Sequence, residues 1–256
     1  CSKSRQIKNI NFEIPNILMA CRKKSQAIKD TLKTLKKYKY CYDIINNIKC
    51  LLGKDNITEM AYHPICTVRE HSTNLHNPNS NFELKKGDLI LLDIGCKYNG
   101  YCSDITRTFP YSGKFTKEQS LIYNIVLKVN KYVIKNLKEG INFGKLENDS
   151  LKLLYLELEK LGLFLKKIDD ENKMINLAEK FMTHSISHMV GIEVHDCGDI
   201  NSLKEGMVIT VEPGIYFNKK LKSDKTINQK ELNKYFNIGG IRIEDTVLIT
   251  KNGSKI

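Results

Sequence analysis

The sequence predicts an α+β fold, because its helical and strand patterns are gathered in separate blocks instead of alternating along the chain. Helical patterns open the chain and return between residues 118 and 181, whereas strand patterns concentrate at residues 89–110 and in the last third. The 256 residues can form one large domain or two small ones, with enough apolar side chains for a sizeable core.

Two amphipathic helices are expected first, over residues 16–37 and 41–52, with Gly53 ending the second. Proline, glycine and clustered asparagine in residues 54–88 then indicate loops around one short strand near residues 64–68. The first long strand pattern begins only after this irregular segment.

A β-hairpin is predicted over residues 89–110, around Asn99-Gly100, the preferred dipeptide of a two-residue type I′ turn. With this turn, position 95 faces 104 and position 93 faces 106 across the ladder. Asp93 and Asp104 then lie on one face about 7–8 Å apart at the backbone, and Gly95 leaves room between them. Two carboxylates this close inside a protein need a cation, and a metal ion is the simplest; at an exposed hairpin tip they would merely be solvated.

The rest of the chain supplies three helices whose apolar residues are assigned to the core, at residues 118–138, 144–161 and 171–181. Three strands follow, at residues 184–190, 207–212 and 241–250. The segment 217–239, which is rich in lysine and asparagine, is expected to be an exposed insertion with a short helix at 229–236.

The net charge of +12 is concentrated near the start of the chain. Residues 1–50 hold 12 Lys/Arg and 3 Asp/Glu, a balance of +9, which leaves +3 for the remainder. Because these lysines alternate with apolar residues, as on a solvated helix face, neither nucleic acid nor a membrane is expected as a partner.

A cytoplasmic location is expected from the cysteines. None of the eight forms a CxxC pair or a zinc-ribbon spacing, which indicates reduced thiols. Nothing at the start resembles a signal peptide, although the chain opens on Cys1 instead of Met, so we expect a fragment or processed form. An organellar location therefore stays open.

Three of the six histidines fall within twelve residues. His184 and His188 are separated by four positions and share a face in a helix or a strand. Ser185 stands where the HExxH motif of zinc proteases needs glutamate, which excludes that motif. His195 follows shortly after. A single histidine is usually a core or surface group, so it is the clustering that indicates a site.

Two glutamates occur where strands meet turns. Glu212 ends an apolar strand before a Pro-Gly turn, and Glu244 shares a strand face with Arg242. Either acid alone could simply be solvated. Together with the hairpin aspartates and one imidazole they form an oxygen-rich set: Asp93, Asp104, His188, Glu212 and Glu244.

Such a set suits Mn²⁺, with Co²⁺, Fe²⁺ or Zn²⁺ as alternatives. Four negative charges need about two divalent ions, and two ions about 3.5–4 Å apart activate a water toward a carbonyl or phosphoryl centre. The sequence therefore predicts a hydrolase with two divalent metal ions, manganese being preferred.

This ordered set, with the segments at 103–110, 184–188 and 211–216, resembles the pita-bread metallopeptidases, which include methionine aminopeptidase, Xaa-Pro aminopeptidase and prolidase. The resemblance runs from about residue 16 to the end. It implies the pita-bread (creatinase/aminopeptidase) fold, a curved antiparallel sheet covered by helices. Residues 16–256 would be the catalytic domain and 1–15 an N-terminal extension or linker, without the N-terminal domain usual in the proline-specific branches.

Within the superfamily the chain is most similar to the Xaa-Pro aminopeptidase (aminopeptidase P) catalytic domain, through the hairpin followed by residues 108–116, and through residues 181–182 and 242–245. That branch implies hydrolysis of the N-terminal Xaa-Pro bond of peptides with proline second, and it is compatible with a homodimer. Prolidase, which cleaves Xaa-Pro dipeptides, is the main alternative. A methionine aminopeptidase and a catalytically inactive binding module of the same fold are further alternatives.

The resemblance also implies residue roles. Asp93 would bind one metal ion and His188 the other, Asp104 and Glu244 would bridge them, and Glu212 would be both ligand and general base. His76 would steady the substrate and the leaving amine, and His195 would hydrogen-bond the scissile carbonyl. His184, Arg242 and Tyr216 would line the proline-side pocket and support the site.

Three departures from the family pattern concern substrate preference and not metal binding. Ser185 replaces a common glycine, residues 66–74 replace a glycine-rich segment near the substrate entrance, and the insertion 217–239 is longer than in a typical bacterial aminopeptidase P.

Overall fold

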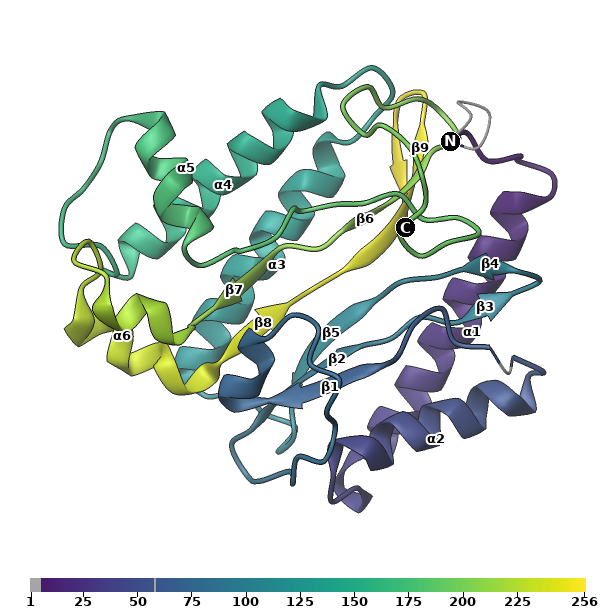
Figure 1. Cartoon of the computed structure of the whole chain (residues 1–256), viewed down its shortest axis with the longest axis horizontal. Coiled ribbons are helices and arrows are strands. Elements are labelled where there is room, and N and C mark those ends of the chain that lie inside the picture. Colours follow the sequence, from purple (N-terminus) through teal and green to yellow (C-terminus); the bar gives the residue numbers. More distant parts are fainter. Residues whose placement is uncertain (1–5, 58) are drawn as a thin grey trace.

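The computed structural model describes residues 6–57 and 59–256 and confirms the α+β class (Figure 1). Its α-helices are α1 (Glu13–Lys33), α2 (Cys41–Lys54), α3 (Lys117–Asn136), α4 (Phe143–Lys160), α5 (Glu171–Glu179) and α6 (Gln229–Tyr235). All six predicted helices are present with ends shifted by a few residues, and Gly53 lies inside α2 instead of ending it. Within the described ranges, no helix combines the length and the apolar character that crossing a membrane requires.

The strands pair antiparallel. They are β1 (Ile65–Val68), β2 (Leu89–Asp93), β3 (Lys97–Tyr98), β4 (Tyr101–Cys102), β5 (Thr106–Pro110), β6 (Val208–Val211), β7 (Gly214–Tyr216), β8 (Gly240–Arg242), β9 (Asp245–Thr250) and β10 (Gly253–Lys255). Two three-stranded sheets, β1-β2-β5 and β10-β9-β6, are accompanied by the ribbons β3-β4 and β7-β8. Helices α3 and α4 share a hydrophobic core with β6 to β9, and α1 and α2 share another with β1 and β2. The strands thus run between two groups of helices (Figure 1).

The hairpin has the predicted register. Asn99 and Gly100 both have positive φ, 49° and 82°, as a type I′ turn requires, and Asp93 pairs with Thr106. The expectation that Gly95 leaves open room is wrong. A Cβ there would lie 2.2 Å from the Ser103 carbonyl oxygen, and the Tyr62 ring is nearly as close, so glycine is needed because the space is already filled.

Residues 184–190 do not form the predicted strand. The segment runs beside β6, but side chains accept two of its amides: the His188 amide donates to Thr210 Oγ1 at 3.0 Å and the Ile186 amide to Glu147 Oε1 at 3.0 Å. Backbone hydrogen bonds to β6 persist, from the Thr210 amide to the His188 carbonyl at 2.8 Å and from the Val190 amide to the Val208 carbonyl at 3.0 Å, but the pairing is assigned only as an isolated bridge from Met189 to Ile209. Side-chain competition of this kind is invisible to a periodicity argument.

The predicted strand 241–250 is interrupted at residues 243–244, between β8 and β9. The Glu244 amide leaves the ladder and donates to the Thr106 carbonyl at 3.0 Å, which ties β5 to the break. The segment 217–239 contains the expected helix, α6, but it is not an exposed insertion. Its Leu221, Ile227 and Leu232 are buried in the core with α3 and α4, while its lysines face outward.

The cysteines follow the expectation in part. Cys21, Cys41, Cys50, Cys66, Cys96 and Cys102 are free thiols. Cys197 is disulfide-bonded, so the prediction of reduced thiols is wrong there. A disulfide requires two cysteines to meet in space, which sequence spacing alone does not show.

Gly239 directly precedes β8 and packs against Arg69 and Ser72, which lie just before the loop that carries His76. Its φ is +77°, and a Cβ there would lie 1.8 Å from the Arg69 carbonyl oxygen. We therefore expect Gly239→Ala to lower the free energy of unfolding by about 2–4 kcal/mol, because both the strained backbone and the clash must be relieved. Urea unfolding measures the change. Gly253→Ala is the matched control, since nothing lies within 4 Å of that site; equal stability of the two variants would contradict the argument.

Candidate metal centre

A cavity of about 470 Å³ opens between β2 and the segment beside β6. Its wall includes nine of the ten predicted site residues: His76, Asp93, Asp104, His184, His188, His195, Glu212, Arg242 and Glu244. Tyr216 is not among these wall residues: it is fully buried, and its hydroxyl bonds to His184 and Arg242, which are. Its aromatic ring packs in the core while its hydroxyl reaches the site from behind.

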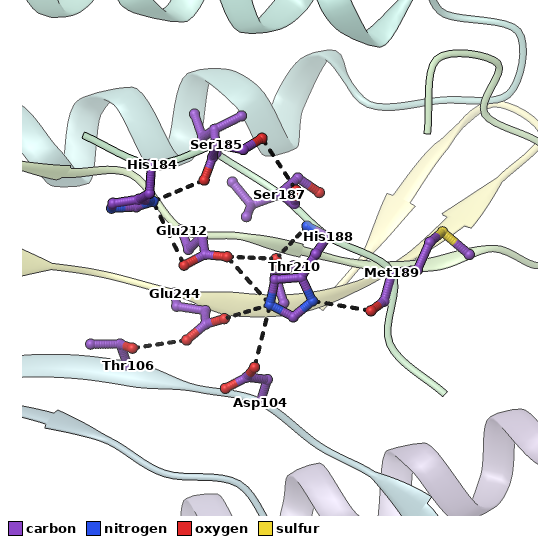
Figure 2. Close-up of polar contacts among 12 residues, drawn as sticks. Asp104, Thr106, His184, Ser185, Ser187, His188, Met189, Thr210, Glu212 and Glu244 are labelled. Atoms are coloured by element: carbon purple, nitrogen blue, oxygen red, sulfur yellow. Dashed lines mark hydrogen bonds and ion pairs between the residues drawn. The ribbon is translucent and has the colours of Figure 1, made fainter. Parts of the chain in front are cut away.

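His188 is surrounded by carboxylates (Figure 2). Its Nε2 atom lies 3.5 Å from Asp104 Oδ2, 3.4 Å from Glu212 Oε1 and 4.0 Å from Glu244 Oε1. Its Nδ1 atom lies 3.0 Å from the Met189 carbonyl oxygen, so in the neutral imidazole Nδ1 carries the proton and the Nε2 lone pair faces the acids. Asp104, His188 and Glu244 each offer a ligand atom, and these atoms lie within 4.8 Å of one another.

Hydroxyl groups orient two of the carboxylates. Thr210, on β6, donates to Glu212 Oε1 at 3.1 Å, and Thr106, on β5, donates to Glu244 Oε2 at 2.8 Å (Figure 2). For Glu244 the oxygen that faces His188, Oε1, is thereby left without this bond, whereas in Glu212 the same oxygen, Oε1, both accepts from Thr210 and faces His188. The alternation of β5 and β6 directs these threonines toward the site, on the same face as the acids.

Asp93 is held by partners other than His188. Its Oδ2 atom lies 2.5 Å from the buried Arg242 guanidinium, and the Tyr62 hydroxyl lies within hydrogen-bond distance of both Asp93 and Asp104. Sequence reasoning missed Tyr62, which lies in the irregular segment before β1. In the sequence, only its polar hydroxyl just before a buried strand could have indicated a role at the site. Tyrosines in such positions are common in proteins, so this signal is not specific.

Three of the four acids are disfavoured as charged carboxylates when no cation is bound. Burial raises the pKa of Glu212 to about 7, and burial followed by repulsion from Asp104 raises the pKa of Glu244 well above its usual range. Burial also raises the pKa of Asp93, against the opposing effect of Arg242. A buried cluster of oxygen donors with one imidazole fits divalent metal ions, which would balance these charges.

This electrostatics predicts how the metal-free protein responds to pH. The folded pKa of Glu212 exceeds its ordinary value of 4.5, so the folded state binds more protons between about pH 4.5 and 7 and stability falls as pH rises through that window. The raised pKa values of Glu244 and Asp93 act in the same direction, whereas the lowered pKa values of His184 and Asp104 oppose it, so the three raised acids must outweigh these two groups. In the presence of a chelator, we expect greater resistance to urea at pH 5.5 than at pH 7.5.

The Glu212→Gln variant serves as the comparison, because it removes one of the titrating groups. Its stability difference between the two pH values should be smaller than that of the parent chain. A chelated parent protein that is equally or more stable at pH 7.5 would contradict this account of the site.

The remaining histidines surround the acids. The His195 ring packs edge-on against His188, with centroids 4.4 Å apart, and His195 itself lies on an exposed loop. His184 Nε2 lies 2.8 Å from the Tyr216 hydroxyl, which accepts from Arg242 at 2.9 Å. Burial and the Arg242 charge lower the pKa of His184 to about 4, so it is neutral near pH 7.

Comparison with known proteins gives a consistent result. The family model for metallopeptidase family M24 matches residues 16–251. A probable Xaa-Pro aminopeptidase from Pyrenophora tritici-repentis is 37% identical over 222 residues, covering 77% of this chain and 48% of its relative. One from Metarhizium acridum is 38% identical over 219 residues, covering 76% and 44%.

Among solved structures, aminopeptidase P from E. coli with the inhibitor Pro-Leu has a TM-score of 0.86 at 31% identity, covering 99% of this chain and 56% of its own. The zinc-substituted E. coli enzyme in complex with product has a TM-score of 0.85 at 32% identity. These matches confirm the pita-bread fold. The chain spans about half the length of the curated relatives it matches.

Proposed function

The chain belongs to metallopeptidase family M24, and we propose that it hydrolyses the N-terminal Xaa-Pro bond of peptides, releasing the first residue, with two divalent metal ions. The observation that carries the proposal is the meeting in one cavity of five donors from separate segments of the chain. The names of its relatives, Xaa-Pro aminopeptidase and aminopeptidase P, support the choice of substrate.

The metal ions would be held by Asp93, Asp104, His188, Glu212 and Glu244, with manganese as the first choice and cobalt, zinc or iron as alternatives. Bound there, they would polarise the scissile carbonyl and activate the attacking water. Asp104 and Glu244 both lie within 4.0 Å of His188, while Asp93 is linked to Asp104 through the Tyr62 hydroxyl. This arrangement suits two adjacent cation positions.

Glu212 would take the proton of the attacking water. Its carboxyl group lies at the end of β6, is only slightly exposed and has a pKa of about 7, which suits a general base near neutral pH. His195 would donate to the oxygen of the scissile carbonyl as negative charge develops on it, and His76 would steady the leaving amine. Both side chains line the cavity.

The proline side of the substrate would lie near His184 and Arg242. His184 is neutral near pH 7 and is held in place by the Tyr216 hydroxyl. It therefore offers the substrate a polar surface without adding a positive charge next to the metal ions. An Xaa-Pro bond is a tertiary amide without an N–H group. A site that polarises the carbonyl does not need that donor, so it can cleave a bond that ordinary peptidases handle poorly.

The test is hydrolysis, in the presence of Mn²⁺, of an Arg-Pro-Pro tripeptide beside a Gly-Pro dipeptide, with products separated by mass. We expect release of Arg from the tripeptide. Cleavage of the dipeptide alone would move the assignment to prolidase. Metal-loaded protein that cleaves neither peptide would contradict peptidase activity for this chain and favour the inactive binding module.

A further inference from the structure

In the described residues before α1, 6–12, a charged side chain is buried while apolar side chains are exposed, the reverse of the usual pattern. Lys8 is 4% exposed, whereas the apolar side chains of Ile7, Ile10 and Phe12 around it are 44%, 72% and 61% exposed. Lysine is almost never fully buried without a partner. A buried ammonium in an otherwise exposed segment therefore indicates a specific contact.

That contact is an ion pair with Asp196. The Lys8 Nζ atom lies 2.6 Å from Asp196 Oδ2, and the two side chains are only 2% and 1% exposed. The pair lies directly against Gly191, where a Cβ would come 2.0 Å from the carboxylate oxygen and 2.5 Å from the ammonium. The Lys8 amide also donates to the Gly206 carbonyl at 2.9 Å, so backbone and side chain are both fixed.

Asp196 directly follows His195 on the loop at the cavity. The Asp196 amide donates to the Met189 carbonyl at 3.0 Å, next to His188, and its second carboxylate oxygen accepts from the Cys197 amide at 2.9 Å. The carboxylate held by Lys8 is thus one residue from the exposed imidazole of His195. Fixing Asp196 limits where that imidazole can lie.

We propose that Lys8 is a positioning residue of the peptidase site, whose ammonium group holds Asp196 and thereby keeps His195 against His188 at the cavity. The inference rests on the proposed function. Without the ammonium, the buried Asp196 carboxylate has lost this counter-charge and is driven toward water, which pulls the His195 loop out of place. Residues 6–12 are then part of the active domain and not a linker.

Lys8→Met tests the proposal in the full 256-residue chain. Because His195 is assigned to the developing charge on the carbonyl oxygen, we expect kcat to fall about 10- to 100-fold with KM changed less than about twofold. The bound Mn²⁺ per chain should be unchanged, and Lys8→Arg should recover part of kcat. Lys23→Met is the control, since Lys23 forms an exposed pair with Asp55 at 3.0 Å.

Coupling to His195 separates positioning from general stability. In the His195→Ala background, Lys8→Met should lower kcat by less than about twofold, because the group it positions is already gone. An additive loss in the double variant would overturn the proposal. If Lys8→Met does not fold, Lys8→Met/Asp196→Asn takes its place, since it removes both charges of the pair, and the same loss of kcat is expected.

Hydrogen exchange tests the positioning role of Lys8 without relying on activity. If the parent chain cleaves no peptide, the proposed function fails, but this test of Lys8 still applies. The amides of residues 189–197 should exchange at least about tenfold faster in the Lys8 variant, while those of α3 stay unchanged. Unaltered exchange in the loop would overturn the positioning role, whatever the activity.

Discussion

Replacing Glu212 with alanine is expected to lower kcat at least about 1,000-fold while leaving the fold intact. The carboxyl group lies 3.4 Å from His188 Nε2, accepts from Thr210 and has a pKa of about 7, so its loss removes the group assigned to proton transfer. General-base catalysis contributes about 10²–10⁴-fold, and loss of a metal contact adds to that effect.

The measurement is kcat for Arg-Pro-Pro at saturating Mn²⁺, with circular dichroism and thermal unfolding as checks of the fold. Glu205→Ala is the matched control, because Glu205 is an exposed glutamate just before β6. It should keep the kcat of the parent chain. A Glu212→Ala variant with near-normal turnover would show that another group handles the proton.

The parts of the site that could be predicted from sequence depend on local geometry. Asn99-Gly100 sets the register of the hairpin, so the shared face of Asp93 and Asp104 follows without knowledge of the rest of the fold. Glu212 could be placed because an apolar strand ended in a Pro-Gly turn, and turns of this kind are encoded by neighbouring residues.

The parts that could not be predicted depend on contacts between distant segments. Tyr62 reaches Asp104 across 42 residues, and Lys8 reaches Asp196 across 188, with no periodic pattern to connect them. The same reason explains why the strand expected at residues 184–190 does not form. Glu147, on α4, accepts a hydrogen bond from the Ile186 amide, which a regular strand would have used in its ladder. The resemblance to a family identified the acids, but it did not identify these supporting contacts.

Removal of divalent metal is expected to abolish turnover and to lower the midpoint of thermal unfolding, and Mn²⁺ should restore both. The acids around His188 repel one another when ionised, so a cation that binds only the folded state stabilises it by mass action. At a free metal concentration of about 100 times Kd this stabilisation is about 2.7 kcal/mol. For a chain of this size, that corresponds to a shift of roughly 5–10 °C.

Asp104→Asn should remove most of this shift and nearly all activity, because Asp104 faces His188 at 3.5 Å and is assigned to both cations. Asp199→Asn, which changes an exposed aspartate on a neighbouring loop, should behave like the parent chain. Differential scanning calorimetry of chelated and Mn²⁺-loaded protein gives the midpoints, and the tripeptide assay gives turnover. Full activity in chelated protein, with no shift on adding Mn²⁺, would refute the metal centre.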